Sequence, residues 1–246
     1  PLHSLCVIDL SNGDARWIDL SQIPVTHRDS FAGVCGICSA EGQIVIATQG
    51  HKPLLALVDL KAAKISTVAS LARCKDTHSL VFHKGHIYAV STGTNEVYRL
   101  SLHGQLFGTE ELYWQFPGVQ YDRDEIHLNG ITLDGERLIA SCFGERDEDG
   151  SWVSNGKVFY LDTEETIREG LIHPHSPLVT EDRLFFAESA AHKVYTYKRL
   201  KRGGWVPSSE IQLAGYTRGL AFNNGRLLVA LSASRKISRS QKTIKK

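Results

Sequence analysis

The chain has 246 residues, a formal net charge of +1 at pH 7 and 42% hydrophobic residues. A chain of this length folds as one large domain or two small ones, and it can bury enough apolar surface to be stable without disulfides. The near-neutral charge excludes a global basic field of the kind that attracts nucleic acid. The sequence contains no run of about 18 apolar residues, so we expect no membrane span.

Five cysteines stand at irregular spacing, which is not typical of a disulfide framework. Reduced thiols are the rule in the cytosol, and no secretory signal precedes the first strand, so we predict a cytoplasmic location. Cys35 and Cys38 have the C-x-x-C spacing of redox proteins. They fall in a predicted strand and lack the helix N-terminus that activates such thiols, so we assign them no redox role.

Five segments of the chain repeat one pattern of a short strand that opens on a small residue, a turn, and a second, more apolar strand. The small residues are Gly36, Ser79, Gly130, Ser176 and Gly219, at spacings of 43, 51, 46 and 43 residues. The turns are Glu41-Gly42, Lys84-Gly85, Asp134-Gly135, Glu181-Asp182 and Asn224-Gly225. Four-stranded β-propeller blades repeat at roughly 40–50 residues. This pattern therefore predicts an all-β propeller.

A third strand with period-two alternation follows in four of the units. These strands are expected at 55–60, 96–100, 157–161 and 193–197, each with a more polar fourth strand beyond it. No helical pattern of useful length occurs, which argues against α/β folds. An insertion at 144–152 is predicted to be an exposed surface loop, or else a cap over one mouth of a central channel.

The two ends of the chain together supply one more blade. Residues 5–10 and 15–18 are expected to form a third and a fourth strand, and residues 217–231 a first and a second strand. Pairing of these ends would remove exposed sheet edges. We therefore predict one domain over 1–246, a five-bladed β-propeller closed by its N-terminal strands on the C-terminal blade. A six-bladed ring is the alternative.

The basic segment 235–246 follows the last predicted strand. It contains six Lys and Arg residues. We predict a frayed, solvated tail, since charge runs at chain ends usually have that structure. A nucleic-acid or membrane role is the alternative for this tail, and we expect neither partner.

The innermost strand of each propeller blade lines the central channel, so residues at equivalent positions form a ring. One ring is predicted to hold Cys35, His78, Asn129, His175 and Arg218, and a second ring, two residues earlier, Gly33, Asp76, His127, His173 and Tyr216. Burying so many polar groups is unfavourable unless they pair or bind something. The alternative is a purely structural role, in which internal hydrogen bonds and channel water satisfy the polar groups of the rings.

Imidazole, thiolate and carboxylate groups suit a transition metal, with zinc or iron as the best fits. We predict His78 and His175 as the first ligands, completed by His127 or His173. Asp76 is expected to act in catalysis, to join the ligands together with Cys35, or to orient a ligating histidine.

Three further ring residues have predicted roles toward a substrate. Arg218 is permanently charged and is expected to bind a carboxylate or phosphate of the substrate. Tyr216 is expected to donate a proton or to seal the channel. Asn129, with Cys35 and Arg218, is expected to contact the substrate.

Several blocks of the sequence resemble the signature of a known family. The blocks are Asp76-Thr77-His78-Ser79-Leu80, His127-Leu128-Asn129-Gly130, His173-Pro174-His175-Ser176-Pro177, Thr217-Arg218-Gly219-Leu220 and residues 231–235. The family consists of conserved hypothetical proteins found mainly in bacteria and described only as a domain of unknown function. The resemblance covers roughly residues 31 to 240 and implies a propeller, but no established reaction. Ser79 departs from it, since glycine is more usual there.

We predict a metal-dependent enzyme of the hydrolase or lyase type that acts on a small, anionic substrate at a histidine-rich site on the propeller axis. The alternative is a non-catalytic propeller module that binds a small ligand or a partner protein.

Overall fold

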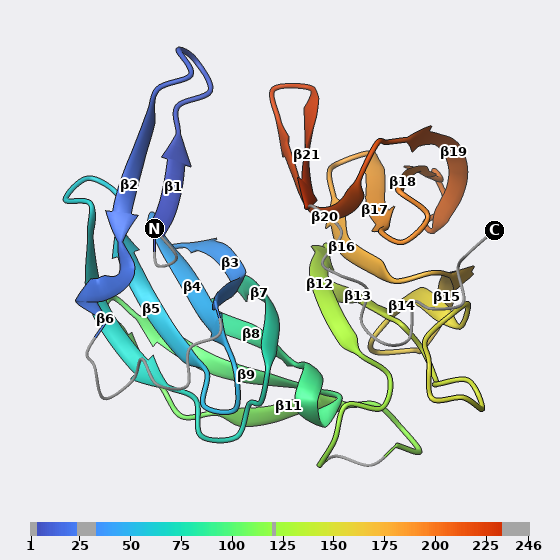
Figure 1. Ribbon diagram of the computed structural model, residues 1–246, viewed down its shortest axis with the longest axis horizontal. Coiled ribbons are helices and arrows are strands. Elements are labelled where there is room, and N and C mark those ends of the chain that lie inside the picture. Colours follow the sequence, from blue (N-terminus) through green and yellow to red (C-terminus); the bar gives the residue numbers. More distant parts are fainter. Residues whose placement is uncertain (1–3, 24–32, 120–121, 233–246) are drawn as a thin grey trace. The chain divides into compact units, whose positions relative to one another are not determined.

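The computed structural model describes residues 4–23, 33–119 and 122–232, and its regular structure is almost entirely β-strand (Figure 1). The described helical turns are two short 3-10 segments, η1 (Leu20–Gln22) and η2 (Thr92–Thr94). Within these ranges no helix has the length and apolar character needed to traverse a lipid bilayer. The all-β prediction is confirmed. The tail 235–246 and the end of the block at 231–235 lie outside the described residues.

The chain divides into two compact units at Phe116, and each unit is considered by itself. The first unit opens with the hairpin β1 (Ser4–Ile8) and β2 (Ala15–Asp19). The first blade follows, with β3 (Gly33–Ala40), β4 (Gln43–Gln49), β5 (Leu54–Asp59) and β6 (Lys64–Ser70). The second blade has β7 (Thr77–His83), β8 (His86–Ser91), β9 (Glu96–His103), β10 (Leu106–Phe107) and β11 (Glu111–Gln115), where β10 and β11 both pair with β9.

The second unit also contains two complete four-stranded blades. One blade has β12 (Leu128–Asp134), β13 (Arg137–Cys142), β14 (Gly156–Tyr160) and β15 (Thr166–Leu171). The next has β16 (Pro174–Val179), β17 (Arg183–Glu188), β18 (Lys193–Arg199) and β19 (Trp205–Gln212). A last hairpin consists of β20 (Tyr216–Asn223) and β21 (Arg226–Ser232). The prediction of one domain over 1–246 stays a prediction.

The repeat read from the sequence corresponds to real strands and turns. The four predicted third strands are β5, β9, β14 and β18, and the N-terminal segments form the expected hairpin. At Glu41-Gly42, Lys84-Gly85 and Asn224-Gly225 both turn residues have positive φ. That geometry is the type I′ turn, whose twist matches the twist of the flanking strands.

Every first strand contains a β-bulge close to its ring residue. The pairing register shifts around Cys35 in β3, His78 in β7, Asn129 in β12 and Arg218 in β20, and directly after His175 in β16. A bulge re-aims the side chain next to it and is common beside active sites. The common position of the bulges confirms that these five residues are structurally equivalent within their blades.

Apolar side chains between neighbouring blades form the core of each unit. In the first unit Val45 and Leu57 of one blade pack with Ile87 and Leu100 of the next. In the second unit Ile139 and Tyr160 pack with Leu184 and Phe186. These residues lie on second and third strands, which explains why those strands are the most apolar in the sequence. The blades are therefore stacked face to face, as in a propeller.

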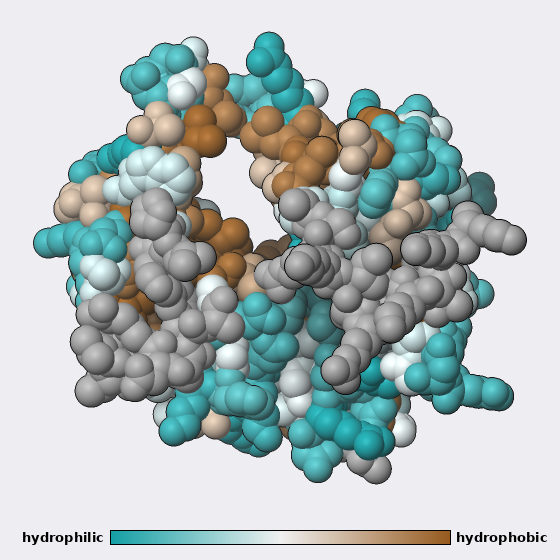
Figure 2. All heavy atoms as spheres, in the orientation of Figure 1, coloured by the Kyte–Doolittle hydropathy of each residue, from teal (hydrophilic) through white to brown (hydrophobic). Residues whose placement is uncertain are grey.

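Several of the exposed large apolar side chains lie on or beside the two terminal hairpins. They are Ile8, Leu10 and Trp17 on or beside β1–β2, and Phe222, Leu228 and Leu231 on β20–β21, where Figure 2 shows hydrophobic patches. In the complete blades the corresponding faces are buried. Each hairpin therefore has the composition of part of a blade.

The small residues of the repeat let neighbouring first strands approach closely. A Cβ atom at Gly36 would lie 2.9 Å from Leu80 Cγ of the next blade. A Cβ atom at Gly130 would lie 2.7 Å from Pro177 Cδ and 2.6 Å from Ser141 Oγ. At Gly219 the nearest atom would be Ala230 Cβ at 3.6 Å, an ordinary contact.

Alanine at Gly130 is expected to destabilise the protein by about 1–3 kcal/mol, the usual cost of overpacking against rigid neighbours. Alanine at Gly219 is the matched control and should change the free energy of unfolding by less than about 0.5 kcal/mol. Urea denaturation of both variants measures the difference. Equal unfolding midpoints for the two variants would show that the close approach at Gly130 is unimportant.

Candidate functional site

The first strands of the second unit bring several ring residues into one neighbourhood. β12 packs beside β16, and β16 packs beside β20. His127 and His173, directly before β12 and β16, have positive φ values of 49° and 53°. Asp76 before β7 in the first unit has φ 55°. Aspartate and histidine tolerate this left-handed backbone better than most residues, and such conformations concentrate at functional sites.

Arg218 is held by His175. The guanidinium Nη1 lies 2.6 Å from Nε2 of His175, which must accept the hydrogen bond through its lone pair. The other ring nitrogen, Nδ1, lies 3.0 Å from the carbonyl oxygen of His173 and 2.7 Å from Ser189 Oγ. Ser189 in turn donates to the carbonyl of Thr217. His175 is therefore the neutral Nδ1–H tautomer, and both of its nitrogens are engaged.

The charge of Arg218 has no carboxylate partner in the described part of the chain. The ion pairs among the described residues join other groups, and the guanidinium lies 5.7 Å from the ring centroid of Tyr216. Arg218 is only partly exposed. A half-buried cation whose hydrogen-bond partner is a neutral imidazole favours a nearby anion.

Tyr216 and His173 form a second hydrogen-bonded pair. The Tyr216 hydroxyl lies 3.2 Å from His173 Nδ1. Burial is the main cause that lowers the pKa of His173, the charges of His127 and Arg218 lower it further, and a hydrogen bond with the Trp152 backbone opposes the shift. His173 is therefore held neutral, and Tyr216 can donate to it.

His127 has a carboxylate partner that was not identified from the sequence. Its Nδ1 lies 2.7 Å from Asp124 Oδ2, and its backbone N–H donates to Asp124 Oδ1 at 2.8 Å. Asp124 thereby fixes the orientation of the imidazole and favours the tautomer with the proton on Nδ1. An imidazole oriented in this way is suited to accept a proton through Nε2.

Phe143 connects the three histidines of the second unit. Its ring stacks on His173 with centroids 4.4 Å apart, lies 4.3 Å from His127 and contacts His175 edge-on at 5.2 Å. Phe143 directly follows β13, as Thr92 follows β8 and Ser189 follows β17. Aligning the ends of the second strands could have identified this position from the sequence, since two of its occupants bind a ring histidine.

Asn129 joins two neighbouring blades. Its Oδ1 accepts a hydrogen bond from Ser141 Oγ at 2.6 Å, and its Nδ2 donates to the Pro174 carbonyl at 2.9 Å. Its side chain is almost completely buried. These contacts support a structural role, and the predicted contact of Asn129 with substrate stays a prediction.

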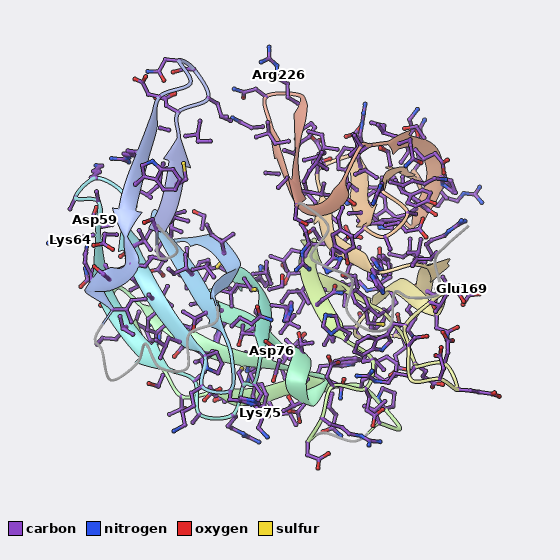
Figure 3. All side chains as sticks on the ribbon, viewed as in Figure 1. Asp59, Lys64, Lys75, Asp76, Glu169 and Arg226 are labelled. Atoms are coloured by element: carbon purple, nitrogen blue, oxygen red, sulfur yellow. The ribbon has the colours of Figure 1, made fainter. Side chains whose placement is uncertain are left out.

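The first unit repeats the arrangement around His78. Its Nδ1 lies 2.9 Å from the Asp76 carbonyl oxygen and 2.9 Å from Thr92 Oγ1. Its Nε2 lies 3.5 Å from Gln49 Nε2, and Gln49 Oε1 accepts a hydrogen bond from Cys35 Sγ at 3.2 Å. Figure 3 labels Asp76 in the first unit. Its carboxylate is 4.0 Å from His78 Nδ1, so the backbone of Asp76 orients His78 more closely than its side chain does.

The predicted site residues thus form two groups. The second unit gathers His127, Asn129, His173, His175, Tyr216 and Arg218, and the first unit gathers Cys35, Asp76 and His78. A single ring that joins both groups stays a prediction. The five cysteines all lie in the described ranges and form no disulfide. Burial raises the pKa of Cys38 to about 12, which agrees with the absence of a predicted redox role for the C-x-x-C pair.

The residues around His175 do not fit the predicted transition metal. Among the described residues, no three histidine, cysteine, aspartate or glutamate side chains are grouped in a way that could hold a metal ion. The Nε2 lone pair of His175 accepts from Arg218, and its Nδ1 carries the proton. A cation at His175 would have to displace the guanidinium and would be repelled by it.

Comparisons with known proteins identify the family and the fold. A family model described as "Domain of unknown function (DUF4915)" matches residues 22–245. No curated protein matches the chain.

Three solved structures are similar over most of the chain. A chain of the nidogen/laminin complex has a TM-score of 0.66 at 9% identity, covering 94% of this chain and 82% of that one. A luciferin-regenerating enzyme has a TM-score of 0.62 at 12% identity, covering 86% and 71%. Virginiamycin B lyase from Staphylococcus aureus has a TM-score of 0.52 at 14% identity, covering 84% of this chain, which spans 65% of the length of that enzyme. Such identities show the fold alone, and they confirm the propeller architecture without deciding the number of blades.

The lowered pKa of His173 predicts acid sensitivity. The unfolded state binds a proton to this histidine at higher pH than the folded state does. The stabilisation is therefore complete above about pH 6.5, the ordinary value for histidine, and is lost as pH falls below it. As the pH falls through this range, the unfolding free energy of the wild-type protein should decrease. The decrease should be less steep in His173→Gln, by at most about 1.4 kcal/mol per pH unit, which is the slope for one proton.

Urea denaturation at a series of pH values measures this slope. His103→Gln replaces an exposed histidine at the end of β9 and serves as the control. A His173→Gln protein with the same acid sensitivity as wild type would contradict the assignment of His173 as a neutral, buried group.

Proposed function

The chain belongs to the DUF4915 family, whose description assigns no activity, and from its own residues we propose that it is an enzyme of the hydrolase or lyase type acting on a small anionic molecule. The observation that carries this proposal is Arg218. Its half-buried guanidinium is oriented by a neutral histidine and has no carboxylate partner among the described residues. An anionic group of the substrate completes this pairing.

Two groups near Arg218 are suited to proton transfer. His127, oriented by Asp124, accepts a proton from the substrate or from water. Tyr216, hydrogen-bonded to His173, donates a proton to a leaving group or stabilises a developing negative charge. Phe143 contacts His127 and His173, so the acid and the base belong to one packed cluster.

The names of two solved structures agree with this reaction class without establishing it. Virginiamycin B lyase and the luciferin-regenerating enzyme are named as enzymes and share the fold. The third, from the nidogen/laminin complex, is not named as one. Because one fold supports unrelated functions, the proposal rests on the residues of this chain.

A non-catalytic module that binds a small ligand or a partner protein is the alternative function. Arg218 supports ligand binding in either case, whereas a proton acceptor at His127, oriented by Asp124, is needed for turnover and not for binding. Turnover therefore separates the two functions. A cytoplasmic location is part of the proposal, and it is supported by five cysteines in the described ranges that form no disulfide.

A panel of small anionic lactones, esters and β-substituted carboxylic acids, followed by proton NMR with the intact protein, tests the proposal. We expect turnover of at least one class. His127→Gln should lower kcat by about 100-fold or more, because it removes the proton acceptor. Arg218→Gln should mainly raise KM, and Arg226→Gln, a change on β21 away from the cluster, should behave as wild type.

Two outcomes would contradict this assignment. Turnover that is unchanged in His127→Gln removes the proposed base. Stoichiometric metal in untagged protein, found by elemental analysis and lost in the His78→Ala/His175→Ala double variant, would favour the metal-dependent mechanism with His78, His127, His173 and His175 as ligands.

We further propose that the ring has five blades, closed by pairing of β1 with β21. Residues 4–10 match the third strand of the first blade, residues 54–60, and both end in the pair Asp-Leu. Asp9 accepts from the Ser11 backbone N–H just as Asp59 accepts from Lys61. In the first blade Ile46 of the second strand lies opposite Ala56 of the third strand. Val229 in β21 has the position of Ile46, and Cys6 in β1 has the position of Ala56. The same register therefore places Val229 opposite Cys6.

Val229→Cys is therefore expected to form a disulfide with Cys6 on mild oxidation, because opposite residues of antiparallel strands lie within disulfide range. Leu228 is the neighbour of Val229 in β21 and faces the other side of the sheet, so Leu228→Cys should not form a disulfide with Cys6. Peptide mapping by mass spectrometry identifies the bond. A Cys6 disulfide in the Leu228→Cys protein but not in Val229→Cys would refute this register.

A further inference from the structure

The insertion between β13 and β14 contacts the histidine cluster directly. We infer that this insertion, residues 144–155, is a structural part of the proposed site, and that Arg146 and Trp152 are positioning residues for His127 and, through Phe143, for His173. The inference deepens the proposed function and depends on it for its catalytic meaning. The surface loop expected from the sequence thereby acquires a specific role.

Trp152 contacts His127 directly and His173 through Phe143, which stacks on His173. Its ring centroid lies 5.1 Å from that of His127 and 5.7 Å from that of Phe143. Its indole N–H donates to the Glu125 carbonyl at 3.2 Å, which ties it to the segment just before His127.

Arg146 holds Trp152 in this position. Its guanidinium lies 3.6 Å from the centroid of the indole ring, a close cation–π contact. Its Nη2 donates to the Asp124 carbonyl at 3.0 Å, and its Nη1 donates to the Gly150 carbonyl at 2.9 Å. One side chain thus joins the insertion to the residue that orients His127.

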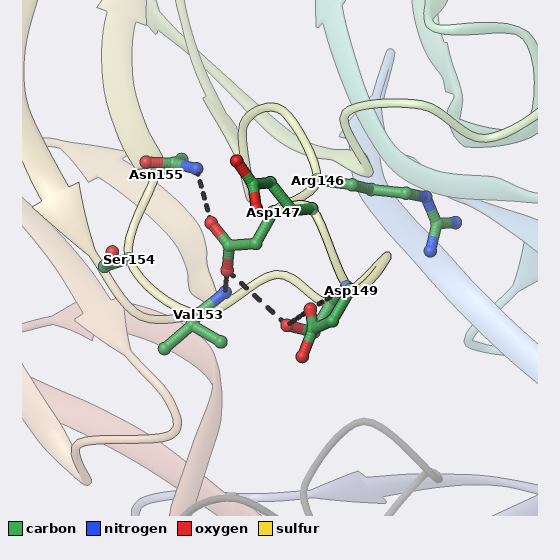
Figure 4. A pocket seen from close by; sticks show the side chains of 8 residues that line it. Arg146, Asp147, Asp149, Val153, Ser154 and Asn155 are labelled. Carbon is green, nitrogen blue, oxygen red and sulfur yellow. Dashed lines mark hydrogen bonds between the residues drawn. The ribbon is translucent and has the colours of Figure 1, made fainter.

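Hydrogen bonds within the insertion fix its shape. Asp147 donates its backbone N–H to the Ser151 carbonyl at 2.8 Å, and its carboxylate accepts from Val153 N at 3.2 Å and from Asn155 Nδ2 at 3.0 Å (Figure 4). At the start of the insertion Gly144 has φ +81°, and a Cβ atom there would lie 2.0 Å from the Asn155 carbonyl oxygen. Only glycine fits this close approach between the two ends of the insertion.

Long-range proton–nitrogen NMR spectra of the full chain labelled with 15N-histidine test the inference, because they report which ring nitrogen carries the proton. We expect His127 as the Nδ1–H tautomer in wild type at pH 8, because its Nδ1 faces the Asp124 carboxylate. Arg146→Ala and Trp152→Leu should shift the ring signals of His127 and His173, with the larger shifts at His127, which Trp152 contacts directly. Glu148→Ala, an exposed change in the same insertion, should leave them unchanged.

Arg146→Lys keeps the positive charge but cannot donate to both the Gly150 and the Asp124 carbonyls as the guanidinium does, so it should give an intermediate spectrum. This variant also provides a test if Arg146→Ala fails to fold. Histidine spectra that are the same in wild type, Arg146→Ala and Trp152→Leu would overturn the inference. This readout needs no substrate. Histidine signals that shift in these variants of a protein that turns over none of the panel would therefore refute the proposed function alone. Where turnover is found, Trp152→Leu should lower kcat by up to about 100-fold with little change in KM.

Discussion

Close approach of neighbouring first strands is the constraint on which the rest of this structure depends. It requires glycine at Gly36 and Gly130, because Leu80 or Pro177 of the next blade fills the space that a larger side chain would occupy there. The approach aligns the β-bulges of successive blades, and each bulge aims one polar side chain. The positions of the site residues therefore follow from the packing of the blades.

Hydrogen bonds to the backbone stabilise the polar residues that this packing buries. His78 and His175 are held in the same way, by a carbonyl two residues earlier and by a hydroxyl that follows the second strand. Their Nε2 atoms differ in environment, since Nε2 of His78 faces Gln49 and Nε2 of His175 faces Arg218. Equivalent positions in different blades thus have a common structural basis and different chemistry.

Much of the fold was predictable from residue order because its signals are local. Alternation of apolar residues marked the third strands, and Glu41-Gly42 and Lys84-Gly85 marked hairpins that the backbone confirms with positive φ. The spacing of the small residues predicted the repeat. The number of blades was not decided in this way, because closure depends on pairing between distant ends of the chain.

The sequence by itself determined the strands, the repeat and the equivalence of Cys35, His78, Asn129, His175 and Arg218, because each depends on neighbours a few residues away. Only the tertiary structure showed that Arg218 binds His175, that Asp124 orients His127, and that Phe143 and Trp152 pack among the histidines. Asp124 precedes His127 by three residues, in a segment outside the repeat, and the other contacts join residues of different blades or of an insertion without periodicity. They also decide the chemistry, since the nitrogen that a metal would need in His175 is occupied by a guanidinium through a contact 43 residues apart.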